Sequence, residues 1–364
     1  MKTKLPYKLV IAFLLISAVS IAGNSMNWKG KHTKEKTIKK EFPVSPNALL
    51  KINNSYGNIN VVTYRGSTTT IEVNIKTNGN DLDKVEAKLE DITVEFNATS
   101  NLVEAKTIFN KNKSKSWWNW GNNNNVNMEI NYLVKLPITN SVDLNNDYGF
   151  INLDKLEGRA MLKCDYGKIT TKELMADGNE IRFDYTKNSY FEYIKSGKIN
   201  ADYSAFTVAK SKDLDIVADY TKSVVEIAEN VKYNCDYGSM TIDNINNVQG
   251  NGDYLTTRIG KVYKNVSITA DYGSLKIDEM ASNAGNINIK TDYVGITIGY
   301  QAGYSFNFEI DLEYASLRDA NEFHFTKERE ESSRNYYLGY YGDASSSNNI
   351  KISSDYGSVT FKKI

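Results

Sequence analysis

The chain has 364 residues, with 44 basic and 44 acidic side chains, and 25 of its residues are tyrosine. A chain of this length readily buries a large hydrophobic core. The even charge balance gives no support for nucleic-acid binding, which requires a basic surplus on one face.

The first 22 residues have the pattern of an export signal peptide. Lys2, Lys4 and Lys8 precede the apolar stretch Leu9 to Ala22, which ends in the small-x-small sequence Ser20-Ile21-Ala22. This stretch is shorter than the roughly 20 apolar residues that span a bilayer, which favours cleavage over anchoring. No second long apolar segment follows. We therefore expect no integral membrane span in the mature chain, and residence in the periplasm or at the cell surface.

Residues 23–41 are rich in lysine and predict a solvated basic linker, with attraction to an anionic envelope surface as the alternative. Residues 42–140 predict an N-terminal β region, in which antiparallel hairpins are inserted between a first repeat unit at Tyr56 and the later ones. A short helix is expected near Leu82 to Leu89. The alternating segments that predict the strands are Thr70 to Lys76, Ile92 to Phe96, Leu102 to Phe109 and Val126 to Leu136.

Residues 141–364 contain a repeat whose marker is Asp-Tyr, often followed by Gly. Most gaps between markers are 17 to 21 residues, which is the signature of stacked structural units. The final gap is two periods long, and residues 327–348 predict a long loop in place of one unit. The marker tyrosines, including the early relative Tyr56, are Tyr56, Tyr148, Tyr166, Tyr185, Tyr203, Tyr220, Tyr237, Tyr254, Tyr272, Tyr293, Tyr314 and Tyr356.

The side-chain pattern within each unit predicts two strands joined at a corner. Aliphatic residues stand four positions before most of the tyrosines, and small residues stand two positions before them, on the same face of a strand. A further apolar residue three positions after the tyrosine has the opposite parity, so the chain must turn. We expect the glycine to take the positive φ of this corner, and the tyrosine to pack inward or at the corner rather than form an exposed sugar-binding stripe.

These features predict an all-β protein whose residues 141–364 form a right-handed parallel β-helix, or β-solenoid, with coils of 17–21 residues. The right hand follows from the general preference of parallel crossovers. The alternative is an antiparallel meander in which each period is one hairpin, but few tight-turn dipeptides stand where it needs them.

Cys164 and Cys235 are the only cysteines, and each lies two residues before a marker tyrosine, four periods apart. Four layers of about 4.8 Å would separate the two residues by roughly 19 Å. A disulfide tolerates at most about 7 Å between its α-carbons. Both thiols are therefore expected to be free, buried and inert.

Several segments resemble a known family. Phe42 to Pro46, Leu50 to Ile52 and Tyr56 to Ile59 resemble the opening of the bacterial putative-adhesin family of unknown function. Leu136 to Ile138, Asp147 to Gly149 and Leu156 to Gly158 resemble that family's entry into its repeats. The similarity covers about residues 42 to 364, and it implies an exported β-helical protein. The heavy Asp-Tyr signature and a tryptophan-rich loop depart from the family pattern.

The repeated aspartates do not predict a metal or catalytic site. Each layer supplies one Asp, whereas calcium-binding β-rolls use Gly-rich nonapeptides that supply several oxygens, so structural corners are favoured over calcium or catalysis. His32 and His324 lack metal-ligand spacing, and His324 is expected to point outward from a strand. No catalytic motif is present. We therefore expect no catalytic residue, metal or cofactor.

The candidate ligand-binding residues are Trp117, Trp118 and Trp120, which lie together in a polar segment and could stack on sugar rings or at a membrane interface. The alternative is that they cover the hairpins or mediate self-association. The segment Tyr336 to Tyr341 is a second candidate loop.

The predicted function is a non-enzymatic exported cell-envelope protein, an adhesin-like binding or scaffold protein whose partner is a glycan or an envelope protein. The alternatives are an envelope-stress signalling accessory and a polysaccharide-acting β-helix enzyme, either a lyase or a hydrolase.

Overall fold

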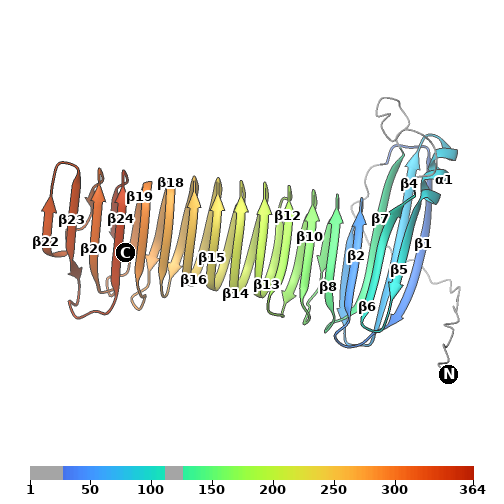
Figure 1. Cartoon of the computed structure of the whole chain (residues 1–364), viewed down its shortest axis with the longest axis horizontal. Helices are drawn as coiled ribbons and strands as arrows, with labels where there is room; N and C mark the ends of the chain where they lie inside the picture. The colour runs from blue at the N-terminus through green and yellow to red at the C-terminus, as the bar shows by residue number, and fades with distance from the viewer. Residues whose placement is uncertain (1–27, 111–125) are drawn as a thin grey trace, which may run out of the picture.

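A computed structural model describes residues 28–110 and 126–364 of the chain. In these residues 25 strands join in one hydrogen-bonded network, and one helix accompanies them, which confirms the all-β prediction. Figure 1 shows a long row of strands with a group of hairpins at its N-terminal end. The predicted signal peptide, residues 1–22, lies outside the described residues. Within them, no helix combines the length and apolar character needed to cross a bilayer.

Each repeat unit contributes one strand segment to a first row, and this segment precedes the marker tyrosine. In β13 to β16 it is the later part of a long strand that begins after the previous marker tyrosine. In β18 and β19 it is the early part of a strand that continues past the tyrosine. Along the stack its members are β2 (Leu49–Ser55), β8 (Ser141–Asp147), β10 (Ala160–Asp165), β12 (Asn179–Asp184), β13 (Ser189–Asp202), β14 (Ala205–Asp219), β15 (Lys222–Asp236), β16 (Gly238–Asp253), β18 (Val266–Met280), β19 (Ile287–Tyr300), β24 (Asn349–Asp355) and β20 (Phe306–Glu313).

The segments that follow the tyrosines form a second row. It contains the early parts of β13 to β16 and the later parts of β18 and β19. Its separate strands are β3 (Ile59–Tyr64), β9 (Phe150–Leu153), β11 (Lys168–Leu174), β17 (Leu255–Val262), β25 (Val359–Lys363) and β21 (Leu317–Arg318).

Neighbouring repeat units pair in parallel and in register. Asp147 pairs with Asp165, Asp165 with Asp184, and Asp184 with Asp202, and the same alignment recurs along the stack. This pairing excludes the antiparallel meander for the repeat region, because a meander would reverse the direction of every second strand.

The core lies between the two rows, where the aliphatic residues of successive units stack on one another. Ile181, Ile199 and Ile216 are fully buried and pair in register, as do Ile151 and Ile169 on the second row. The two cysteines are buried and free, as predicted, and the register places four strand steps between them. Burial raises the pKa of each thiol to about 12, so the reactive thiolate is disfavoured.

Antiparallel hairpins close the N-terminal end of the stack. The predicted strands and the helix are present, and the helix is capped by the Asp81 side chain, which accepts a hydrogen bond from the Lys84 amide at 3.3 Å. Although inserted in sequence, these hairpins lie beyond β2 and β3 in space, so Tyr56 and Tyr148 remain neighbours. The elements are β1 (His32–Pro43), β4 (Thr68–Gly79), α1 (Leu82–Asp91), β5 (Ile92–Ala98), β6 (Leu102–Phe109) and β7 (Asn127–Pro137).

Strand β1 differs from the predicted solvated linker of residues 23–41. From His32 onward this segment pairs along its full length with β4 in antiparallel register. Its lysines occupy an edge strand, where charged side chains discourage pairing with a further chain. The lysines correctly indicated that this segment is exposed to solvent. They could not indicate that it forms a strand, because its partner β4 lies far away in the sequence.

At the C-terminal end, the spatial order of the strands differs from their order in the sequence, and a predicted loop is replaced by strands. The last repeat strand, β24, lies between β19 and β20. In the stack, the last unit of the sequence therefore lies between the two units that come before it in the sequence. The predicted loop 327–348 instead contains the end of β22 (His324–Glu330) and the whole of β23 (Arg334–Tyr341). They extend β20 as an antiparallel hairpin. Phe306, Phe323, Tyr341 and Phe361 pack together beneath it and fill this end of the core.

Candidate binding surface

The twelve marker tyrosines all adopt the left-handed backbone conformation, with φ between 49° and 62°. The prediction that glycine would carry the positive φ is therefore wrong. A left-handed residue reverses the alternation of side chains, so the tyrosine leaves the face of the buried residues two and four positions before it. Of the predicted inward or corner packing, the inward alternative is wrong: these side chains lie at the corner and are 39% to 58% exposed.

The tyrosine rings form one continuous stack, here called the tyrosine ladder. Neighbouring ring centroids lie 4.6 to 5.2 Å apart, and the ring planes deviate from parallel by no more than 9°. Eleven such steps separate the end rings by roughly 50 to 57 Å, close to the spacing that paired strands impose. Tyr356 stacks between Tyr293 and Tyr314, and Phe109 packs edge-on against Tyr56 at the other end.

The glycines that follow the tyrosines allow the close approach of neighbouring layers. A Cβ added at Gly167 would lie 1.8 Å from the carbonyl oxygen of Gly149, and one added at Gly149 would lie 1.7 Å from that of Gly57. These glycines have no positive φ. Their function at the corner is to provide space rather than conformational freedom.

The aspartates before the tyrosines form a parallel column of carboxylates. Between Asp165 and Asp253, each next aspartate donates its backbone N–H to the carboxylate of the preceding layer, at distances of 2.8 to 3.3 Å. These bonds support the predicted structural role at the corners. Burial first, and neighbouring aspartates next, raise the pKa of Asp147 and of Asp253.

The phenol groups lie in the field of these carboxylates. Burial is the largest cause of the raised pKa of Tyr203, followed by the two neighbouring tyrosines and then by Asp202 and Asp219. The ladder presents a row of hydroxyl groups beside a row of carboxylates. Most ring faces are covered by neighbouring rings, so the ladder offers ring edges and hydroxyls to a partner rather than faces for stacking.

The other predicted site residues lie apart from the ladder or outside the described residues. Trp117, Trp118 and Trp120 are outside them, so the prediction of ligand binding there is not tested. The predicted loop Tyr336 to Tyr341 belongs to strand β23, in which Tyr337 and Tyr341 are buried.

His32 lies on β1 and His324 on the exposed strand β22, at opposite ends of the molecule (Figure 1). In residues 28–110 and 126–364, no three histidines, cysteines or acidic residues are grouped as a metal site would require.

Comparisons with known proteins give similarity in structure only. No family model matches the chain, and no curated protein matches it either. Among solved structures, a putative cell adhesion protein from Clostridium sporogenes is similar at 12% identity, covering 90% of this chain and 100% of that one, with a TM-score of 0.18.

Two further solved structures are also described as putative adhesins. The one from Parabacteroides distasonis has 9% identity, covers 72% of this chain and 92% of its own, and has a TM-score of 0.32. The one from Bacteroides fragilis has 14% identity, covers 90% and 97%, and has a TM-score of 0.24.

Proposed function

We propose that this chain is an exported, non-enzymatic cell-envelope protein that binds or scaffolds an envelope partner through its tyrosine ladder. The observation that carries the proposal is the set of twelve exposed tyrosines with positive φ. A left-handed conformation costs roughly 1 kcal/mol or more for a non-glycine residue, and Asn or Gly would adopt it more easily. Stacking offsets this by about 0.5 to 1.5 kcal/mol per pair. Backbone conformation alone would therefore favour Asn or Gly over Tyr at these corners.

The repetition of the site argues for binding over catalysis. Hydrolysis of a glycoside needs two carboxylates with different environments in one cleft. Here the carboxylates recur in register, each followed by a stacked tyrosine, and the five from Asp165 to Asp236 accept the same backbone hydrogen bond. A row of similar groups suits a partner that extends along the stack.

The proposal includes the architecture and the cellular location. The parallel, in-register pairing of the repeat units supports a right-handed β-solenoid, because parallel crossovers are almost always right-handed. The pattern of residues 1–22 supports export, to the periplasm or the cell surface. The tryptophan segment at residues 117–120 is retained as a second, separate candidate contact.

The test uses the chain without residues 1–22 and isolated bacterial envelopes in a sedimentation assay. In one variant, Tyr203, Tyr220 and Tyr237 are changed to Asn, which tolerates the left-handed backbone and removes three consecutive rings. In the matched control the same residues are changed to Phe, which keeps the rings and removes the hydroxyls. A third variant carries Ala at Trp117, Trp118 and Trp120.

We expect the Asn variant to bind at least tenfold more weakly while retaining its circular dichroism spectrum, and the Phe variant to show how much the hydroxyls contribute. Loss of binding only in the tryptophan variant would move the contact to that segment and contradict the role of the ladder. Absence of envelope binding by the unmodified chain would contradict the binding proposal as a whole.

A further inference from the structure

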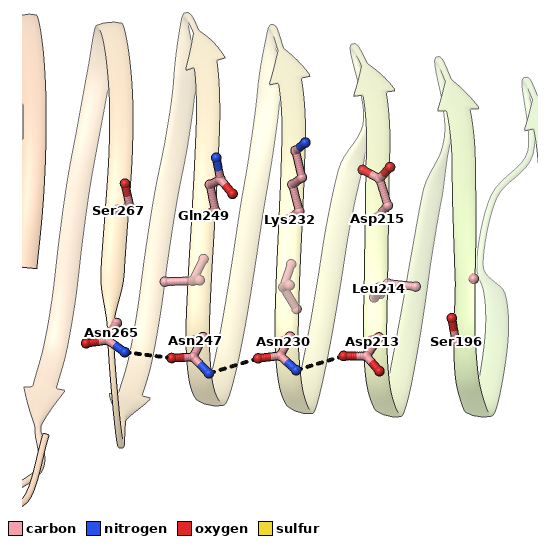
Figure 2. A pocket seen from close by; sticks show the side chains of 13 residues that line it. Ser196, Asp213, Leu214, Asp215, Asn230, Lys232, Asn247, Gln249, Asn265 and Ser267 are labelled. Atoms are coloured by element: carbon pink, nitrogen blue, oxygen red, sulfur yellow. Dashed lines mark hydrogen bonds between the residues drawn. The ribbon is translucent and has the colours of Figure 1, made fainter. Parts of the chain in front are cut away.

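A groove crosses the first row at the end of its strands away from the tyrosines. It encloses about 420 Å³ and extends over five successive layers, from Ser196 on β13 to Ser267 on β18. Figure 2 shows these layers side by side, with polar side chains at matching heights on each strand. In β15 the groove begins seven residues before Tyr237. At about 3.3 Å per residue, the lining residues Asn230 and Lys232 lie roughly 23 Å and 17 Å from Tyr237 along the strand.

One wall of this side groove is a ladder of amides joined by hydrogen bonds. The Asn230 amide nitrogen donates to the Asp213 carboxylate at 2.7 Å, Asn247 donates to the Asn230 oxygen at 2.8 Å, and Asn265 donates to the Asn247 oxygen at 3.0 Å. Each inner amide therefore keeps one N–H and one oxygen lone pair for a further partner. Because these hydrogen bonds already fix the asparagine side chains, ligand binding costs little of the conformational entropy of these side chains.

The opposite wall stands two residues further along each strand. It contains Asp215, Lys232 and Gln249, at a distance of about 6.6 Å along the strand. The side chains of Lys232 and Gln249 are exposed, and neither forms a hydrogen bond or ion pair with another residue in the described part of the chain. Between the walls stand Leu214, Val231 and Val248, whose side chains are only 2% to 4% exposed because alternation directs them into the core. The groove therefore offers a ligand the polar groups of its two walls.

The charges and the spacing of the groove restrict its ligand. Asp213 and Asp215 disfavour a phosphorylated or sulfated polymer, and with Lys232 as the one basic residue the lining has a net charge of −1. Polar groups recur once per layer, at about 4.8 Å, whereas an extended peptide advances about 3.3 Å per residue and falls out of step. A β-linked pyranose chain in its extended form advances close to one layer per ring, and its hydroxyls can both donate and accept.

We propose that the side groove binds a linear, neutral, β-1,4-linked polysaccharide segment of about four sugar rings lying along the stack, since four steps span roughly 19 Å. The hydroxyls pair with the free N–H and oxygen groups of Asn230 and Asn247 on one wall, and with Lys232 and Gln249 on the other. The inference names a ligand class for the proposed binding role, but it rests on residues that the tyrosine ladder does not include.

The experiment measures binding of cellohexaose and chitohexaose to the chain without residues 1–22 by isothermal titration calorimetry. An oligogalacturonate hexamer serves as the acidic probe, and the corresponding trisaccharides test the length of the site. The first groove variant is Lys232→Ala with Gln249→Ala, which removes exposed side chains that have no partner and should leave the fold intact. The second is Asn247→Ala, which interrupts the amide ladder.

The matched control is Asn234→Ala with Asn251→Ala. These two asparagines form an equivalent amide contact of 2.7 Å on the same strands but outside the groove. We expect at least one neutral hexamer to bind more tightly than its trisaccharide and than the acidic hexamer. Both groove variants should weaken this binding about tenfold, the loss expected for one or two hydrogen bonds, and the control should leave it unchanged.

Failure of both neutral hexamers to bind at millimolar concentration would overturn the inference, as would equal weakening by the control pair. The variant with Asn at Tyr203, Tyr220 and Tyr237 separates the two proposals. If it retains hexamer binding but loses envelope binding, both surfaces act independently. If it loses hexamer binding while folded, the saccharide contacts the ladder and the side groove is not the site.

Discussion

At the residue scale, the decisive feature is the backbone conformation of the tyrosines. Alternation along the strand predicted that Tyr203 would face the same side as Ala201 and Ile199, and both of these residues are buried. The tyrosine is instead half-exposed because its φ is 51°. A single left-handed residue reverses the alternation, and Tyr is an uncommon occupant of that conformation. The repeat pattern therefore located the corner, but it led us to expect the positive φ at the glycine that follows many of the marker tyrosines rather than at the tyrosine itself.

The carboxylate column gives a prediction at this scale. Asp147 has one buried oxygen for which the described residues provide no hydrogen bond, and its pKa is raised by burial and by Asp165, against the opposing effect of Lys163. We expect Asp147→Asn to increase the free energy of unfolding at neutral pH by on the order of 1 kcal/mol, the size of one such repulsion when water screens it.

The pH dependence of this effect has a defined sign. A raised carboxyl pKa means that the native state binds the proton more tightly than the unfolded chain does. The contribution of Asp147 to stability is then fully present below its unfolded pKa, and it is lost as the pH rises through its folded pKa. The advantage of the Asn variant should grow from about pH 3 to pH 7, as measured by thermal unfolding. Glu226→Gln, at an exposed position of β15, is the control. A gain that is the same at both ends of this range would contradict the assignment.

At the element scale, the strands were predicted well wherever alternation or the repeat specified them. The hairpin strands of residues 70–136 and the helix at Leu82 were correctly predicted because each has a local pattern of period 2 or 3.6. Strand β1, the later part of β22 and the whole of β23 were missed. The side chains of β1 and β22 are largely exposed and charged, so no apolar period marks these two strands. They exist because β4 and β23 provide partners.

The packing of neighbouring units gives a second prediction. Gly167→Ala places a Cβ against the backbone carbonyl of Gly149, which cannot move without separating two layers. We expect a loss of about 3 kcal/mol in the free energy of unfolding in urea. Gly295→Ala is the matched control, because no atom lies within 4 Å of its added Cβ and its φ is not positive. It should be neutral or stabilising by up to about 1 kcal/mol. Equal effects of the two changes would show that the close approach does not limit the corner.

At the scale of the whole molecule, the order of the units differs from the order of the sequence. Strands β24 and β25 lie between β19 and the β20 to β23 group, so the end of the chain is held inside the stack. The doubled gap before Tyr356 was consistent with one missing unit in sequence. The gap could not show where the last unit lies in the stack, because its position is set by strand pairing between distant segments.

This arrangement gives a third prediction. A chain that ends at Ser347 lacks β24 and β25, and β20 then has no parallel partner. Because each layer contacts only its neighbours, the effect should be local. Backbone amides of β19 and β20 should lose protection from hydrogen exchange, measured by mass spectrometry, whereas those of β8 and β10 should keep it. A chain that ends at Lys362 is the control. Loss of protection throughout the stack would contradict the local character of the layers.

The sequence by itself determined the all-β class, the repeat period, the buried aliphatic residues and the free cysteines. These features follow from which side chains recur at a fixed spacing. Only the tertiary structure decided the exposure of the tyrosines, the insertion of β24 and the meeting of Asp213, Asn230 and Asn247 along one groove. The exposure of the tyrosines depends on one backbone torsion angle, and the insertion of β24 depends on pairing between segments that are distant in sequence. Asp213, Asn230 and Asn247 recur every 17 residues, but only the register of the paired strands brings that spacing into side-chain contact.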